Sequence, residues 1–154
     1  MWDISVGGSA LSGESSRDAA MRETHEELGI VLNLHGMRPK FTINFEQGFD
    51  DFYLIRLDAD IDNLVLQEDE VQAVKWASVN DILQMIDEGT FIPYYKSGTC
   101  LILGMATVAN HNQCEILLVA VTGFRGRTFC SQKAKYRSLF TCGILTHFAA
   151  SGRI

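Results

Sequence analysis

The stretch from Gly8 to Ile30 constrains the fold more than any other part of the chain. It reads GSALSGESSRDAAMRETHEELGI, and its second half is rich in good helix formers. Ser15 or Ser16 can cap the start of a helix, Asp18 then falls in the first turn, and Gly29 can end the helix with a positive φ. The sequence therefore predicts a helix between these caps.

Three glutamates of this predicted helix share one face. Glu23, Glu26 and Glu27 stand at i, i+3 and i+4, a spacing that places their carboxylates side by side. Like charges at this spacing repel each other, so the arrangement costs stability unless a cation lies among them. Converging carboxylate oxygens suit Mg²⁺ or Mn²⁺. An acidic run can also be a plain solvated face, and the three glutamates alone favour that second interpretation.

The wider spacing changes this balance. The polar and glycine positions form a pattern of Gly8, five residues, Glu14, seven residues, Arg22-Glu23, two residues, Glu26-Glu27, one residue, Gly29 and apolar Ile30. This pattern resembles the Nudix box at every one of those positions. Thr24 departs from it, because the family usually has an aliphatic residue there; threonine keeps the β-branched shape.

The resemblance implies a chemistry for these residues. Nudix proteins are mostly hydrolases that split a diphosphate linked to another moiety, and they use divalent ions. By this resemblance Glu26 and Glu27 would be the main metal ligands, and Glu23 would be a ligand or the base that deprotonates water. Glu14 would add a ligand or contact one, and Arg22 would hold a glutamate in its productive rotamer. Gly8 would start the loop tightly at the substrate.

The residues before the box resemble one branch of the family. Trp2-Asp3-Ile4-Ser5 followed by two glycines is similar to isopentenyl-diphosphate isomerase and its hydrolase-like relatives. Those isomerases carry a catalytic Cys where this chain has Gly7 and a metal-binding His where it has Ser9. Hydrolysis is therefore the preferred function, and an isomerase-like enzyme is the alternative.

A further candidate lies in an acidic loop. Glu68, Asp69 and Glu70 precede a predicted strand over residues 71–76. In several relatives a glutamate of this loop reaches the metal or serves as base, so the resemblance makes Glu70 the candidate here. The predicted catalytic residues are Glu23, Arg22 and Glu70, and the predicted metal ligands are Glu14, Glu23, Glu26 and Glu27.

Alternation and turn residues predict the remaining elements up to residue 96. We expect strands over residues 1–6, 30–34, 41–45 and 52–57, in addition to 71–76. Ser78 with Asp81 three residues later predicts the start of a second helix, which Gly89 ends. These elements and the resemblance predict an α/β (α+β) Nudix-type sandwich with a mixed sheet between helices. Because at least one long strand usually precedes the box, we also expect that N-terminal strands of the sheet are missing.

Charge and cysteine content divide the chain. Up to Ser97 there are seven basic and eighteen acidic residues, whereas six basic and one acidic residue follow, within a net charge of −6 over 154 residues. The acidic balance argues against a nucleic-acid partner. All four cysteines lie after Ser97 without CxxC pairing, which favours free thiols in a cytoplasmic protein over zinc or disulfides.

We therefore predict a Nudix domain over residues 1–96 and a tail of unknown structure over residues 97–154. Residues 101–103 and 116–121 could form buried strands in this tail, and neither run is long enough to span a membrane. The expected partner is a small-molecule diphosphate. The oligomeric state is left open, a homodimer included. An inactive, truncated remnant of the family is the second alternative.

Overall fold

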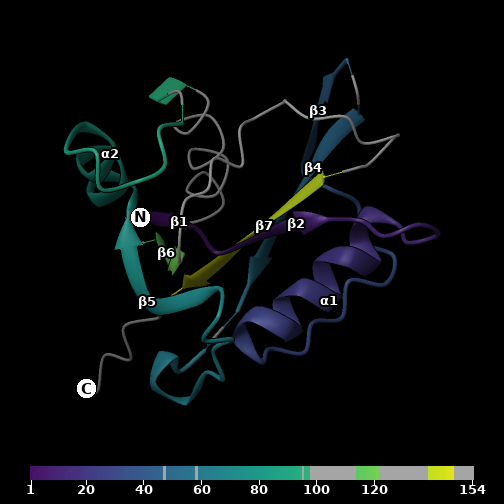
Figure 1. The fold of residues 1–154 in the computed structure, drawn as a ribbon, viewed down its shortest axis with the longest axis horizontal. Helices are drawn as coiled ribbons and strands as arrows, with labels where there is room; N and C mark the ends of the chain where they lie inside the picture. The colour runs from purple at the N-terminus through teal and green to yellow at the C-terminus, as the bar shows by residue number, and fades with distance from the viewer. Residues whose placement is uncertain (47, 58, 95, 98–113, 122–138, 148–154) are drawn as a thin grey trace, which may run out of the picture.

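A mixed sheet with one helix on each side forms the fold (Figure 1). The computed structural model describes residues 1–46, 48–57, 59–94, 96–97, 114–121 and 139–147. The elements are β1 (Trp2–Ile4), β2 (Val6–Ser9), α1 (Ser16–Leu28), β3 (Phe41–Phe45), β4 (Gly48–Arg56), the short 3₁₀ helix η1 (Ile61–Asn63), β5 (Val71–Ser78), α2 (Val79–Asp87), β6 (Cys114–Val121) and β7 (Leu139–His147). The predicted α/β architecture with a mixed sheet is confirmed.

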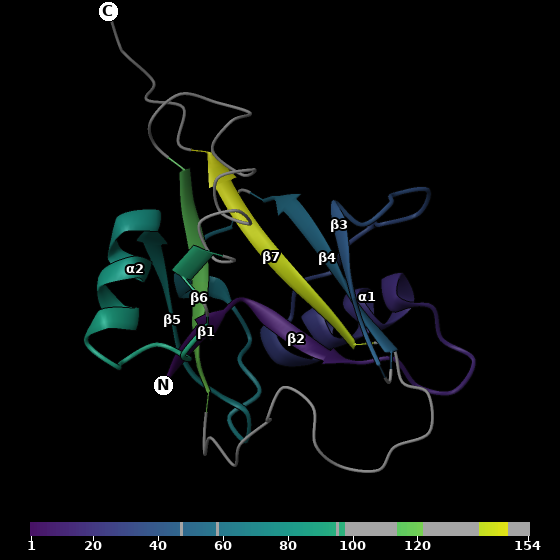
Figure 2. The same ribbon diagram turned by 90° about the horizontal axis from the view of Figure 1, so that it is seen from above.

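Two strands from the last third of the chain join the sheet together. β6 pairs antiparallel with β1 and β5, while β7 pairs antiparallel with β2 and parallel with β4. β6 and β7 pair with each other, and β3 lies at the edge beside β4 (Figure 2). The strand expected at residues 116–121 is therefore present within β6. The strand expected at residues 101–103 lies outside the described residues, and the domain division at residue 96 stays a prediction.

The first predicted strand is wrong in its extent. The chain forms two strands where one was expected over residues 1–6, because Ser5 between them adopts a φ of 25°. This left-handed conformation is uncommon for a residue other than glycine, and it breaks the extended backbone. The break lets β1 pair with β6 and lets β2 pair with β7.

The predicted helix is confirmed as α1, together with its caps. Ser15 is the N-cap, and it forms a capping box with Asp18. Gly29 ends the helix with a φ of 69°, and its N–H donates to the carbonyl of His25. A Cβ at this position would stand 2.8 Å from the Cβ of Val65, so the site needs glycine for its backbone conformation and for its space.

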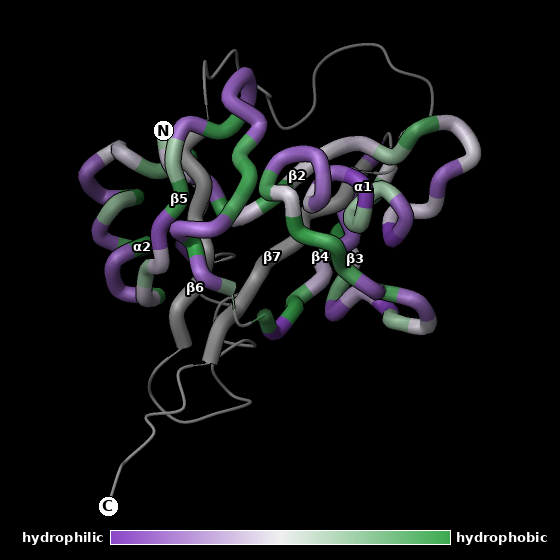
Figure 3. Tube along the Cα trace, turned by 90° about the horizontal axis from the view of Figure 1, so that it is seen from below, coloured by the Kyte–Doolittle hydropathy of each residue, from purple (hydrophilic) through white to green (hydrophobic). Residues whose placement is uncertain are grey.

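The second helix is also confirmed. α2 begins after the capping box of Ser78 and Asp81, and Gly89 follows it with a φ of 69°. Hydrophobic and hydrophilic residues alternate around its turns (Figure 3). Ile82 and Met85 form the buried side, so α2 packs as an amphipathic helix.

The two helices cover opposite faces of the sheet. Successive side chains of a strand point to opposite faces, and on β4 Tyr53 and Ile55 pack in one buried cluster whereas Leu54 packs against another. The first cluster includes the buried apolar residues of α1, and the second includes those of α2. α1 contacts β2 and β7, while α2 contacts β5 and β6 (Figures 1 and 2).

One other predicted strand is wrong. Residues 30–34 form no strand, although Leu32 and Leu34 are buried as the apolar pattern suggested. The segment runs alongside α1, where the backbone N–H of Leu34 donates to Sδ of Met21 at 3.4 Å, so its side chains are buried without strand pairing. The strands expected at 41–45 and 71–76 are confirmed, and β4 begins at Gly48, earlier than the predicted residue 52.

A buried network fastens the start of α1 to the sheet. Asp51 on β4 accepts hydrogen bonds of 2.5 Å from the hydroxyls of Ser16 and Thr42. The Ser16 hydroxyl also lies 2.9 Å from the Tyr53 hydroxyl. Because Ser16 is the first residue of α1, this network fixes the helix relative to β3 and β4.

Asp50 is the neighbouring carboxyl, which points to the other face of β4. Its side chain is 5% exposed, and its Oδ1 has no hydrogen-bond partner in the part of the chain described. Burial and then the charge of Asp51 raise the pKa of the Asp50 carboxyl. A carboxyl whose pKa is raised on folding stabilises the fold while it is protonated, and this contribution is lost as the pH rises through the folded-state pKa.

We therefore expect Asp50→Asn to raise the free energy of unfolding at pH 7 by about 1–3 kcal/mol, because a neutral amide replaces a buried charge. The gain should shrink as the pH is lowered from 7 toward 4, because a carboxyl with a raised pKa takes up its proton in the folded state before it does so in the unfolded state. Urea melts across this range measure it. Asp51→Asn is the matched control and should destabilise the protein at pH 7, because Asp51 accepts two hydroxyl hydrogen bonds. A gain that does not change with pH would contradict the raised pKa.

Candidate functional site

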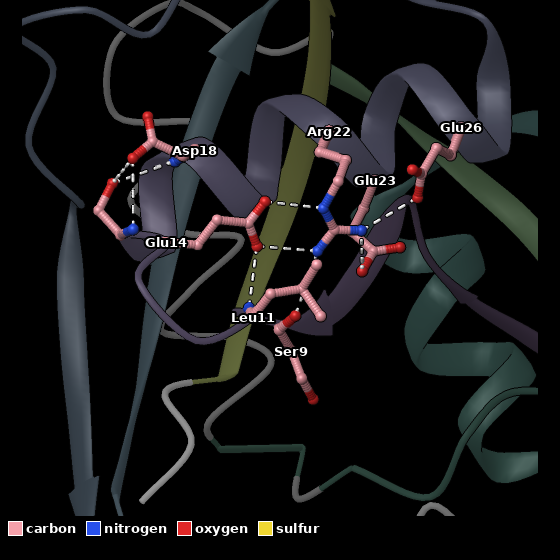
Figure 4. A network of polar contacts seen from close by, with 8 residues as sticks. Ser9, Leu11, Glu14, Asp18, Arg22, Glu23 and Glu26 are labelled. Atoms are coloured by element: carbon pink, nitrogen blue, oxygen red, sulfur yellow. Dashed lines mark hydrogen bonds and ion pairs between the residues drawn. The ribbon is translucent and has the colours of Figure 1, made fainter.

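Three of the predicted carboxylates surround the guanidinium of Arg22 (Figure 4). Its Nε lies 2.8 Å from Oε1 of Glu14, and its Nη1 lies 2.9 Å from Oε1 of Glu23 and 3.0 Å from Oε2 of Glu26. Its Nη2 donates to Oε2 of Glu14 and to the carbonyl of Ser9. The repulsion expected between Glu23 and Glu26 is thus relieved by a cation from the same helix.

The contact with Glu14 is the most complete of the three. Arg22 binds both carboxylate oxygens of Glu14, and the backbone N–H of Leu11 donates to Oε2 at 2.9 Å. The hydrogen bond from Arg22 is the main reason why the pKa of Glu14 is lowered. The same contact raises the pKa of Arg22, so both groups stay charged. Glu14, which precedes α1, is therefore tied to the helix.

The absence of a side chain at Gly8 leaves the space that the Glu23 side chain occupies. A Cβ at residue 8 would stand 2.7 Å from Cδ and Oε1 of Glu23 and 2.9 Å from its Cγ. Only a residue without a side chain lets β2 approach α1 this closely while Glu23 keeps its present position. The space beside Gly8 is thus filled by Glu23, and the predicted contact of Gly8 with substrate stays a prediction.

For the hydrolysis that the sequence analysis predicts, we expect Gly8→Ala to lower kcat/KM by about tenfold or more, because the added methyl group displaces Glu23. Thermal stability should change little, since Glu23 is a flexible side chain that can move. The effect on activity and the effect on stability are separated by measuring hydrolysis and thermal melts on the same samples. In a Glu23→Ala background the same substitution should have no further effect on kcat/KM. Full activity of Gly8→Ala would show that the present position of Glu23 is not needed.

The other predicted residues lie around this cluster. The Glu26 side chain is 50% exposed, whereas Glu27 is buried at 5%. Glu70 closes a turn, in which its backbone N–H donates to the carbonyl of Gln67. The backbone N–H of Gln67 in turn donates to the carbonyl of Glu27. The loop of Glu70 is therefore attached to the C-terminal end of α1, beside Glu27.

The donor chemistry of the cluster fits a divalent cation. Carboxylate oxygens of Glu14, Glu23 and Glu26 already converge on one positive group, and such oxygens are the ligands that Mg²⁺ and Mn²⁺ prefer. Across the described ranges, however, no three His, Cys, Asp or Glu side chains form a group that could hold a metal ion as they stand. A divalent cation at this place would compete with Arg22 for carboxylate oxygens. The metal assignment of Glu14, Glu23, Glu26 and Glu27 stays a prediction.

Sequence reasoning missed the backbone partners of the cluster. The carbonyl of Ser9 and the N–H of Leu11 hold Arg22 and Glu14, and no side-chain pattern marks such groups. It also missed Asp51, which anchors Ser16. Two adjacent aspartates that interrupt an apolar strand are the signal that could have revealed it.

Comparison with known proteins identifies the family of the chain. Residues 1–95 match the NUDIX domain, so the chain belongs to the Nudix family. The match contains the whole of α1 and the carboxylate cluster around Arg22.

Several relatives are themselves named as Nudix hydrolases. The chain is 45% identical over 94 residues to an uncharacterized Nudix hydrolase of Listeria monocytogenes and to another of Listeria innocua, which covers 61% of this chain and 56% of each relative. It is 32% identical over 95 residues to an uncharacterized Nudix hydrolase of Clostridium acetobutylicum, covering 56% of this chain and 46% of that protein. The chain thus matches about half the length of these relatives. No solved structure matches it.

Among the described residues, neither helix is both long and apolar enough to cross a bilayer.

Proposed function

We propose that this chain is a metal-dependent hydrolase of a diphosphate linked to another moiety. The observation that carries the proposal is the convergence of Glu14, Glu23 and Glu26 on the face of a Nudix helix. Those hard oxygen donors would hold Mg²⁺ or Mn²⁺. When bound there, the ion would supply positive charge for the phosphate oxygens and would lower the pKa of an attacking water.

The residues of the chain then have separate roles. Glu23 is held against Gly8 and is the proposed base that takes a proton from water. Arg22 is a positioning residue, because it contacts the three carboxylates and the Ser9 carbonyl. Glu26 is the most exposed of the three carboxylates and is the proposed ligand that meets solvent and substrate. Glu27 is proposed as a further ligand and Glu70 as a further base or ligand; the attachment of the Glu70 loop to Glu27 supports placing the two together.

The proposed substrate is a small molecule, and the reaction breaks a phosphoric anhydride bond. The box would position a diphosphate, but it does not specify the attached group, which can be a sugar, a nucleotide or a prenyl group. We place the activity in the cytoplasm because the four cysteines are widely spaced and form no CxxC motif, a pattern that favours free thiols. An isomerase-like activity has less support, because Gly7 and Ser9 occupy the positions where the isomerases carry their Cys and His.

The test is phosphate release from nucleoside, sugar and prenyl diphosphates, with Mg²⁺ and with EDTA. A phosphatase added to the assay counts phosphomonoester products. Turnover of at least one compound, abolished by EDTA, is expected. Conversion of isopentenyl diphosphate to dimethylallyl diphosphate, followed by mass spectrometry, would favour the isomerase instead. No turnover by protein that melts cooperatively would overturn the proposal and favour an inactive remnant.

A further inference from the structure

A cavity of about 780 Å³ lies at the edge of the sheet, away from the carboxylate cluster. The segment of residues 31–40 forms one wall and the end of β4, residues 54–57, forms the other. Its volume is within the usual range of small-molecule sites, which is about 300–1,000 Å³.

The cavity lies on the other flank of α1 from the carboxylates. Leu34 of its wall donates from its backbone N–H to Sδ of Met21, whereas Gly8 lies against Glu23. Residues two positions apart on an α-helix point in nearly opposite directions, so Met21 and Glu23 mark opposite flanks. The cavity is therefore separate from the proposed hydrolytic site.

Three positive side chains line this cavity. Arg38, Lys40 and Arg56 are all exposed, and none of them forms an ion pair with any described residue. They are three of the seven basic residues up to Ser97, in a part of the chain that holds eighteen acidic residues. Three other basic side chains have partners: Arg22 binds the glutamates, Lys96 binds Asp87, and Lys75 lies over the Trp2 ring. Arg17 is half-buried on α1, outside the cavity. Of the four exposed basic residues described in this acidic region, three therefore line one cavity.

The same cavity offers apolar surface and an open strand edge. Val31 is 82% exposed and Met37 is 39% exposed, although both are large apolar residues. β4 continues to Arg56 beyond Phe52, the last residue paired with β3. The carbonyl of Phe52 accepts from the N–H of Lys40, and by the two-residue period of a strand the backbone groups of Leu54 and Arg56 face the same side.

We propose that this cavity is a second binding site, for a small organic phosphate. The dianionic phosphate lies among Arg38, Lys40 and Arg56, and the organic part lies against Val31 and Met37. A phosphate suits the site because three cations and backbone N–H groups can share its oxygens. The proposal is independent of the hydrolytic function, because it uses none of the carboxylates of the box.

The test uses phenyl phosphate in excess EDTA, so that no divalent cation can hold the anion at the carboxylates. The ligand is titrated into the ¹⁵N-labelled chain, and amide shifts report where it binds. Saturable shifts are expected at residues 31–40 and 54–57. Shifts centred on Gly8, Glu14 and α1 would overturn the assignment to this cavity, as would the absence of saturable binding.

Variants test the role of the charges. The combined substitutions Arg38→Gln, Lys40→Gln and Arg56→Gln should weaken binding by about tenfold. Lys96→Gln is the matched control, because it removes an exposed positive charge outside the cavity, and it should change affinity by less than about twofold. Equal weakening by the control and by the triple variant would show a general charge effect and would overturn the proposal.

Three further ligands test the chemistry of the occupant. Benzyl alcohol should bind much more weakly than phenyl phosphate, since it lacks the charge, and inorganic phosphate should bind more weakly because it lacks the apolar part. Benzoate carries one negative charge, so its affinity should lie between those of benzyl alcohol and phenyl phosphate. Benzyl alcohol binding as tightly as phenyl phosphate would overturn the role of the cations, and tighter binding of benzoate would overturn the assignment to phosphate.

Discussion

A chain that ends at Ser97 is expected to show no cooperative unfolding transition. β1 and β5 pair only with β6 among the named strands, and β2 pairs only with β7. Without the last third of the chain, the named strands would keep only the pairing of β3 with β4, besides the isolated bridge between Trp2 and Phe91. A two-stranded hairpin is marginally stable at best, and an ordinary domain has a total stability of only about 5–15 kcal/mol, so losing these pairings is expected to abolish the cooperative fold.

Circular dichroism during heating measures this loss. A chain that ends at His147 is the matched control, because it keeps both β6 and β7 and should melt as the full chain does. If the chain ending at Ser97 melted cooperatively at the same temperature, then residues 1–97 would form a stable fold by themselves. That result would contradict the central place of β6 and β7 in the sheet.

Glu26→Gln is expected to lower kcat/KM by at least about 100-fold and to leave the melting temperature nearly unchanged. Activity falls because a proposed metal ligand loses its charge. Stability is kept because Glu26 is half-exposed and makes one contact with Arg22, at 3.0 Å, and an exposed pair of this kind contributes at most about 1 kcal/mol. Glu27→Gln is a poorer test, since Glu27 is buried and its replacement can disturb the fold.

Mn²⁺ binding is measured through the relaxation of water protons. This measurement distinguishes a loss of metal binding from other causes of lost activity. Glu26→Gln should weaken Mn²⁺ binding, whereas Glu88→Gln, an exposed glutamate beside α2, should change neither Mn²⁺ binding nor activity. Unchanged turnover in Glu26→Gln would remove Glu26 from the proposed ligand set. Lost turnover with unchanged Mn²⁺ binding would give Glu26 a role other than holding the metal.

Local features of the sequence were sufficient to predict both helices. Ser15 with Asp18, and Ser78 with Asp81, form the capping boxes at the predicted positions. These signals work because each cap is satisfied by residues three positions away, with no help from the rest of the fold. Glu23 and Glu26, which contact Arg22, were also found through their spacing along one helix, and Glu14 was found through the wider spacing of the box.

Features that depend on distant partners could not be predicted in the same way. The apolar run at residues 30–34 is buried beside α1, and its pattern cannot distinguish burial by a helix from pairing in a sheet. The close approach of Gly8 to Glu23 and the hydrogen bond from Ser16 to Asp51 arise only when the strands are in place. The pairing of β7 with β2 and β4 joins residues that are far apart in the sequence, which no local pattern specifies.

The position of β1 and β2 also has a consequence for how the protein folds during synthesis. Trp2 pairs with Ala120 and Val6 pairs with Cys142, so during synthesis β1 and β2 wait for partners that are made more than a hundred residues later. Such a high contact order slows folding, because the entropy of closing a long loop is lost before the contacts form. α1 and α2 can form early from local signals, whereas the sheet closes only after His147 has left the ribosome. Until then the edges that β4 and β5 will pair with β7 and β6 are exposed, so we expect the incomplete chain to be more prone to aggregation than the complete one.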